Sequence, residues 1–261
     1  RKEYFVASDA TPIVEYTRDM VYMNDGEVAT IRCGEEIKIT TLDNEDVCHD
    51  VKHVEMNIGC LEKGGYPHFM LKEIFEQPQS LRECMRGRLL EKQREIVLSA
   101  VRDHQEELLQ AGRFIVVSCG TSWHAGLIGK QLIESFCQIP VVVEYASEFR
   151  YRNPVINKGD VVIAVSQSGE TADTLAAMQL ARDNGAFVFG IVNSVGSSIA
   201  RATDTGTYIH VGPEIGVAST KAFTGQVAVF AMLALALAKA KGTIADEEYR
   251  ETVAELASIP E

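Results

Sequence analysis

The chain has 261 residues, 46% of them hydrophobic, which is enough for one large or two modest domains with a buried core. Its 25 Lys and Arg residues against 37 Asp and Glu residues give a net charge of −12, so nucleic acid and anionic membranes are poor partners. The six cysteines form no C-x-x-C pair, which indicates free thiols in a reducing compartment, and we expect a cytoplasmic protein. No apolar run follows Arg1-Lys2-Glu3, so no signal peptide is predicted.

Residues 1–57 have the alternating, β-branched pattern of short strands. The sequence Asn24-Asp25-Gly26-Glu27 predicts the turn of a hairpin between Val21–Met23 and Val28–Ile31. Further strands are expected at Tyr4–Ala7 and Ile37–Thr41. So small a piece, with no initiating Met, is expected to be a β-rich remnant of a larger domain.

A segment rich in Gly and Pro follows at Ile58–Pro67 and predicts a linker. His68–Glu76 predicts a short helix that ends before Pro78. Gln79–Gly112 predicts a long, mostly helical stretch whose charged face is solvated.

From Arg113 onward, short apolar runs alternate with helical patterns. The expected strands are Phe114–Ser118, Pro140–Glu144, Asp160–Val165, Ala186–Val192 and Thr207–Val211. The expected helices are Thr121–Cys137, Ser147–Arg152, Ala172–Asn184, Ser197–Thr203 and Lys221–Lys241. This alternation predicts an α/β fold from Arg113 onward, with a parallel five-stranded sheet covered by helices on both faces. A last helix, Ala245–Ile259, would lead out of the domain over 243–261.

Three loops are expected at one edge of this sheet, because right-handed crossovers bring the carboxyl ends of parallel strands together. They are Ser118–His124, Ser166–Thr171 and Glu214–Lys221. Each is made of small, hydroxyl-bearing residues that let a ligand approach the backbone, and each leads into a helix. None contains an evident nucleophile–base pair, so the loops favour binding over bond-making.

The most specific of the three loops lies within VVIAVSQSGETADT at Val161–Thr174. A buried strand there ends in a tight turn that carries the hydroxyls of Ser166, Ser168 and Thr171 and opens a helix. Free backbone N–H groups and the positive end of the helix dipole favour a bound phosphate at such a turn. The alternative is that Ser168 or Thr171 is only an N-cap, a task that one hydroxyl performs alone.

Other kinds of site are disfavoured by the same loops. Gly120 is followed by Thr121 and Ser122, so the G-x-G-x-x-G dinucleotide fingerprint is missing, and no P-loop motif occurs. Cys119 and His124 could suggest a nucleophile and its base, but a small apolar Cys at a strand end is favoured. Cys48, His49, His53 and Cys60 fit no usual zinc spacing, and we expect no metal.

Val227–Ala238 contains no polar side chain and is too short to span a bilayer, so it predicts a helix that is buried nearly all round. A partner subunit could supply part of that cover, which would make the chain a homodimer. Alternatively, the stretch Gln79–Gly112 covers the helix within the chain. We favour the homodimer.

Four motifs resemble the sugar isomerase (SIS) domain: CGTS at Cys119–Ser122, EYASEFRYR at Glu144–Arg152, SQSGETADT at Ser166–Thr174 and EIGVASTKAF at Glu214–Phe223. As a set they are similar to the glutamine–fructose-6-phosphate aminotransferase (isomerising) family. FMLKEIFEQP at Phe69–Pro78 and MRGR at Met85–Arg88 resemble its interdomain segment, and EYFVASDATPIVEYT at Glu3–Thr17 resembles the end of its glutaminase domain.

The resemblance implies an enzyme that converts fructose 6-phosphate and glutamine to glucosamine 6-phosphate and glutamate, with a glutaminase and two SIS domains. Residues 1–57 would then end the glutaminase domain, 58–90 would be the linker, 91–242 the first SIS domain, and 243–261 would lead to the second. Glutamine would bind only through the part of the glutaminase domain that is absent here. The family's N-terminal Cys and its catalytic groups in the second SIS domain are also absent, so we expect no catalytic residue, no cofactor and no synthase activity from this segment alone.

Carried onto this sequence, the resemblance implies that the phosphate of fructose 6-phosphate or glucose 6-phosphate is held by Ser122, Ser166, Ser168, Thr171 and the backbone N–H of Gln167. Thr121, Val217 and Ser219 would contact the sugar, and Cys119 and Gly120 complete the first loop. A non-catalytic phosphosugar sensor is the main alternative, and a lone phosphosugar isomerase is a second one. The sensor would need an attached DNA-binding module, which is not visible, and the isomerase would need its own Glu and His pair.

Overall fold

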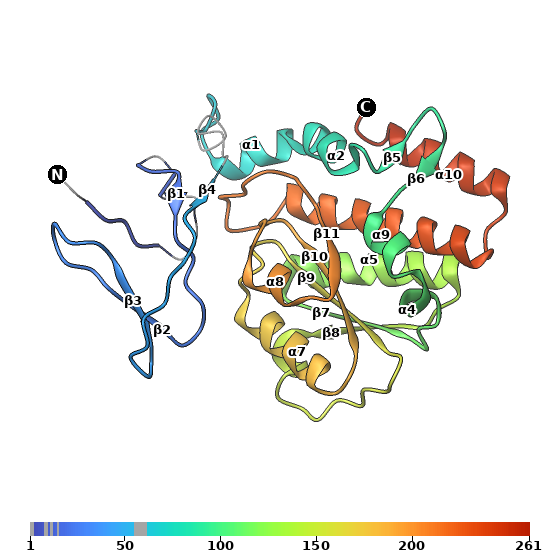
Figure 1. Cartoon of the computed structure of the whole chain (residues 1–261). Helices are drawn as coiled ribbons and strands as arrows, with labels where there is room; N and C mark the ends of the chain where they lie inside the picture. Colours follow the sequence, from blue (N-terminus) through green and yellow to red (C-terminus); the bar gives the residue numbers. More distant parts are fainter. Residues whose placement is uncertain (1–2, 8–9, 11–12, 15, 55–61) are drawn as a thin grey trace. The chain divides into compact units, whose positions relative to one another are not determined.

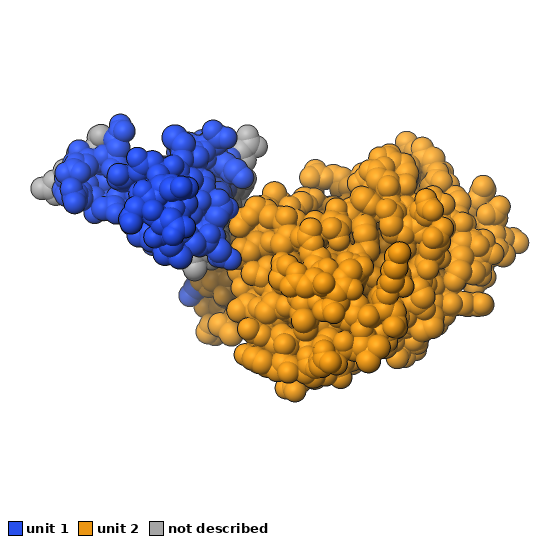
Figure 2. Space-filling model, turned by 60° about the horizontal axis from the view of Figure 1, so that its bottom comes forward, with its two compact units in different colours: residues 1–64 blue, residues 65–261 orange. Residues whose placement is uncertain are grey.

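The computed structural model describes residues 3–7, 10, 13–14, 16–54 and 62–261. It divides into two compact units, residues 1–64 and residues 65–261, coloured separately in Figure 2. The division falls between Gly64 and Gly65, inside the predicted linker Ile58–Pro67. Residues 58–61 of that linker lie outside the described residues.

The described residues of the first unit form two small antiparallel sheets. Strand β1 (Asp19–Met20) pairs with β4 (Lys52–His53), and β2 (Glu27–Thr30) pairs with β3 (Lys38–Thr41). The second pair confirms the strands predicted near Val28–Ile31 and Ile37–Thr41.

The predicted hairpin partner Val21–Met23 is wrong, and so is the strand at Tyr4–Ala7, because neither segment is in a strand. The turn itself does form, and Glu27 N–H donates to the Asn24 carbonyl at 3.3 Å. The Glu27 carboxylate, however, accepts the Asn24 N–H at 2.7 Å. That bond occupies a donor that a strand leading into the turn would need for pairing, and β2 pairs with β3 instead.

The second unit is built on a five-stranded parallel sheet with the order β11-β10-β9-β7-β8. Its strands are β7 (Phe114–Ser118), β8 (Val141–Tyr145), β9 (Val161–Ser166), β10 (Phe187–Val192) and β11 (Thr205–Tyr208). The central strands β7 and β9 are buried along their whole length, since helices cover both faces of the sheet. The predicted α/β class and sheet are confirmed.

Helices lie on both faces of the sheet, as Figure 1 shows. On one face α5 (Gly120–Cys137) and α9 (Lys221–Lys241) enclose a core with alternate side chains of the strands, such as Val116 and Ile163. On the other face α7 (Ala172–Asp183) and α8 (Ser198–Ala202) pack on the intervening side chains, such as Ile115 and Val162. The short helix α6 (Ala146–Phe149) contributes Phe149 to the second core.

The segment before the sheet differs from the predicted long helix over Gln79–Gly112. Helices α1 (Phe69–Phe75) and α2 (Gln77–Met85) are followed by a hairpin of β5 (Leu89–Leu90) and β6 (Glu95–Ile96), and then by α3 (Ser99–Asp103) and α4 (Gln105–Leu109). Gly87 at φ +73° and Arg94 at φ +50° break the helical path, because both lie in the left-handed region. The helical prediction for this stretch is therefore wrong in its middle.

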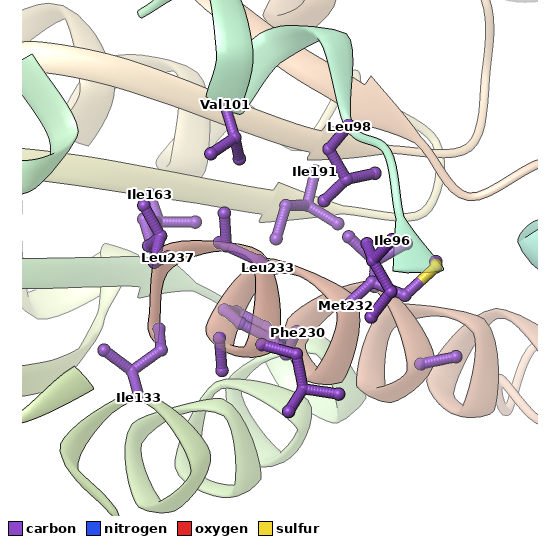
Figure 3. Close-up of a cluster of buried hydrophobic side chains, with 14 of the residues drawn as sticks. Ile96, Leu98, Val101, Ile133, Ile163, Ile191, Phe230, Met232, Leu233 and Leu237 are labelled. Atoms are coloured by element: carbon purple, nitrogen blue, oxygen red, sulfur yellow. The ribbon is translucent and has the colours of Figure 1, made fainter. Parts of the chain in front are cut away.

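Helix α9 is covered within the chain. Its apolar side chains Phe230, Met232, Leu233 and Leu237 meet α5, the strands and the preceding segment, as Figure 3 shows. Residues Ile96, Leu98 and Val101 of that segment belong to the same core. Helix α10 (Asp246–Ser258) adds the buried Tyr249, Val253 and Leu256. The segment 79–112 therefore supplies cover for α9 that a partner subunit could have provided, and the homodimer stays a prediction.

By length and composition alone α9 could cross a membrane, since its 21 residues have a mean hydropathy of 1.6 in the most apolar window. In this structure, 72% of that window is buried inside the protein. Its predicted role as a buried core helix is confirmed.

Candidate functional site

The strand order creates a switch point between β7 and β9. Counting from β7, the chain first adds β8 on one side and then returns to add β9 on the other. In such sheets ligands bind outside the carboxyl ends of the strands at this point. Ser118, at the end of β7, pairs with Val165 next to the end of β9, so the loops that follow the two strands begin side by side.

The loop after β9 is ordered by its own hydroxyls. Ser166 Oγ is buried, lies 3.0 Å from Thr171 Oγ1 and accepts the Gly169 N–H at 3.0 Å. Ser168 Oγ accepts the Glu170 N–H at 3.1 Å. Thr171 occupies the N-cap position of α7, yet it makes no side-chain cap bond to the helix. The explanation that Thr171 serves only as a capping residue is therefore not supported.

Gly169 makes this turn possible. Its φ of +69° lies in the left-handed region, and a Cβ at this position would lie 1.9 Å from Ser197 Oγ. Both facts require glycine. Glu170 is exposed, and its Oε1 accepts the Ser198 N–H at 2.8 Å, so this carboxylate is engaged at the start of α8.

The loop after β7 leads directly into the 18-residue helix α5. Gly120 begins that helix at φ +58°, and the N-cap residue Cys119 makes no side-chain cap bond. Thr121 is exposed, whereas Ser122 is buried and its Oγ accepts Gln226 Nε2 at 3.0 Å. That bond joins the first turn of α5 to α9, because Gln226 belongs to α9.

The third loop, 214–221, is held at its carboxyl end by Glu214. Its Oε1 accepts the backbone N–H groups of Thr220 at 2.8 Å and Ala222 at 3.2 Å and thereby caps α9. Between these fixed points Val217 is fully exposed and Ser219 is half-buried. The loop therefore presents its middle to solvent while its end is anchored.

The alternatives considered from the sequence find little support. His124 Nδ1 lies 3.0 Å from the Gly120 carbonyl, and the His124 ring packs edge-on against Trp123. Cys119 packs against the second core, as expected for an apolar Cys. His49 pairs with Glu27 and His53 with Asp19, each at 2.8 Å.

No cluster of three potential metal-ligating side chains occurs among the described residues. Cys60, which belongs to the same sequence pattern, lies outside them.

A cavity of about 280 Å³ lies elsewhere in the second unit, along β7 and the edge strand β8. Its charged side chains are already paired. Arg113 donates to Asp160 at 2.7 Å, and Arg152 forms an ion pair with Glu144. The cavity shares no residue with the three loops.

The loops 118–124 and 214–221 are supported by residues that the sequence did not indicate as part of the site. Gln226 holds Ser122 from α9, and Glu73 and Glu76 reach the third loop from α1 and its C-cap. The motif FMLKEIFEQP was noticed, but only as a linker. Its two acidic residues, Glu73 and Glu76, give no local sign of a contact with residues 214–221.

Comparison with known proteins identifies the fold. Residues 107–236 match the family model described as SIS domain. These residues are a SIS domain. Over 99% of its length the chain is also 67% identical to a glutamine–fructose-6-phosphate aminotransferase (isomerising) of Bacteroides thetaiotaomicron and 53% identical to one of Chlorobaculum tepidum. The chain spans 42% of the length of each of these relatives.

A solved structure supports the same assignment. The C-terminal domain of a glucosamine–fructose-6-phosphate aminotransferase from Francisella tularensis matches with a TM-score of 0.71 and 38% identity. The match covers 76% of this chain and 55% of that one. The resemblance proposed from the four motifs is thus confirmed, and so is the SIS fold.

Proposed function

We propose that this SIS domain binds the sugar phosphate of an enzyme that makes glucosamine 6-phosphate from fructose 6-phosphate and glutamine. The observation that carries the proposal is the switch point between β7 and β9. Two hydroxyl-rich loops start there side by side, and each enters a helix whose N-cap side chain makes no cap bond. Uncapped helix N-termini are favourable positions for a phosphate.

The proposed division of labour follows the loops. The phosphate is held by Ser122, Ser166, Ser168, Thr171 and the Gln167 N–H, with Cys119 and Gly120 shaping the first turn. Thr121, Val217 and Ser219 contact the sugar. This arrangement suits an acidic protein, because hydroxyls and backbone dipoles bind the anion without lysine or arginine.

The remaining parts of the assignment belong to the same proposal. The segments 1–57, 58–90, 91–242 and 243–261 correspond to the end of a glutaminase domain, a linker, the first SIS domain and a helix leading to a second. The catalytic groups and the glutamine site lie in other parts of the whole enzyme, which is cytoplasmic and needs no cofactor. The curated relatives support this proposal through their names and their identity to the chain.

Isothermal calorimetry with fructose 6-phosphate and glucose 6-phosphate tests the binding role. Each hydrogen bond lost to the charged phosphate costs about 1.5–3 kcal/mol, so Ser168→Ala combined with Thr171→Ala should weaken binding by about 3–6 kcal/mol. Thr252→Ala, which removes an exposed hydroxyl on α10, is the matched control and should leave affinity unchanged. Equal affinity of the double variant and the unmodified chain would sink the phosphate assignment.

A further inference from the structure

Glu73 of α1 reaches across to the third loop. Glu73 is only 2% exposed, and its carboxylate accepts two consecutive backbone N–H groups. Oε1 accepts Ile215 N–H at 2.6 Å and Gly216 N–H at 3.0 Å, and Oε2 lies 3.2 Å from Gly216 N. Hydrogen bonds to an ionised acceptor are roughly twice as strong as neutral ones, so this is a firm anchor.

Gly216 permits this close contact. A Cβ at this position would lie 2.6 Å from Glu73 Oε2 and 3.4 Å from Met70 Cα. No positive φ is required there, so the glycine is explained by proximity to α1 and not by backbone strain. The small size of Gly216 on the loop and the carboxylate of Glu73 on α1 therefore both contribute to this contact.

A second bond ties α1 to the other end of the loop. Lys221 Nζ, in a side chain that is 6% exposed, lies 2.7 Å from Glu76 Oε2. Lys72 Nζ lies 3.4 Å from the other oxygen of Glu76. Together with the Glu214 cap, these bonds fix residues 215–216 and 220–222, and only the stretch that contains Val217 and Ser219 lies between them.

The phosphate loops are held by different groups. Ser166, Ser168 and Thr171 are bonded within their own turn, and Ser122 is held by Gln226. The contacts from α1 thus fall on the loop 214–221, which the proposed function assigns to the sugar. Removal of Glu73 should release that part and leave the phosphate part in place.

We propose that Glu73 is a positioning residue for sugar recognition. It sets the backbone of residues 215–219 so that Val217 and Ser219 meet the sugar, and it acts through Ile215 and Gly216. The inference rests on the proposed function. It makes the segment before the sheet a working part of the binding site and not only a connector.

The experiment compares two ligands by calorimetry: fructose 6-phosphate, which uses both parts of the site, and inorganic phosphate, which uses only one. Glu73→Gln keeps the size of the side chain but replaces one acceptor with a donor that faces N–H groups. We expect at least a tenfold loss of affinity for fructose 6-phosphate and less than a twofold change for phosphate. Glu83→Gln, a surface carboxylate on the neighbouring α2, is the control and should change neither affinity.

Gly216→Ala is the second variant, and it disturbs the same contact from the loop side. It should give the same split between the ligands, whereas Gly112→Ala, which meets open space, should not. An equal loss for both ligands would show a merely structural role and overturn the inference, as would unchanged sugar-phosphate affinity in both variants. Failure of the unmodified chain to bind either ligand would instead overturn the proposed function, and the inference with it.

Discussion

Replacing Gly169 with alanine tests the construction of the phosphate turn. Two separate costs arise at this position. The φ of +69° is unfavourable for any residue with a Cβ, by about 1–2 kcal/mol. The new Cβ would also lie 1.9 Å from Ser197 Oγ and 2.5 Å from Ser197 Cβ, and such overpacking costs about 1–3 kcal/mol.

Gly185→Ala separates these costs, because Gly185 has a similar φ of +82° but meets open space. Replacing glycine with alanine also lowers the conformational entropy of the unfolded chain, which raises stability. This gain is the same in both variants, so it cancels in the comparison. We therefore expect Gly169→Ala to lower the free energy of unfolding by about 2–5 kcal/mol and Gly185→Ala by about 1–2 kcal/mol. Urea denaturation followed by circular dichroism measures both values.

A rescue variant makes the test sharper. Ser197→Gly removes both clashing atoms, and its hydroxyl has no hydrogen-bond partner within the described chain. A glycine at this N-cap position costs only a few tenths of a kcal/mol. In the Gly169→Ala background it should restore about 1–3 kcal/mol, a coupling that a double-mutant cycle reports. Equal losses in Gly169→Ala and Gly185→Ala, with no rescue, would refute the reasoning.

The remaining predictions concern the thiols and the assembly. Burial raises the pKa of Cys84 and of Cys137 to about 12. At pH 8 a thiol reagent should therefore label the exposed Cys33 and Cys48 well before these two. Peptide mass spectrometry at increasing reaction times measures this order of labelling. Because the folded pKa of each buried thiol lies above the unfolded one, their contribution to stability should fall as the pH rises from about 9 toward 12, and stability that rises over this range would contradict the assignment. We also expect a homodimer from the family resemblance, although the burial of α9 within the chain no longer argues for one. Light scattering at micromolar concentration should give twice the chain mass of 28.7 kDa, and a strictly monomeric mass would refute the prediction.

The sheet and its helices could be predicted because their signals are local. Phe114–Ser118 and Lys221–Lys241 were predicted with the bounds that the structure has, since a buried strand is an unbroken apolar run and a buried helix lacks a polar stripe. Topology then followed from general rules for parallel sheets. The loops at the switch point were found for the same reason.

The missed features depend on turns and distant partners. The helical pattern of Gln79–Gly112 conceals a hairpin, because Gly87 and Arg94 adopt left-handed conformations that periodicity does not reveal. The anchor from Glu73 to Ile215 joins residues 142 positions apart. Nothing in either local sequence indicates the other, so this support of the candidate site was visible only in the structure.

The wrapping of α9 by the segment before the sheet has a consequence for synthesis on the ribosome. Cys84 of α2 donates to the carbonyl of Gly225, 141 residues further along the chain. At about 5–20 residues per second, the buried face of α2 waits about 7–28 s for its partner helix to be made. During that interval the apolar side chains of residues 81–101 lack α9, which completes the core that they share with it. We therefore expect holding chaperones to bind the nascent chain until α9 emerges.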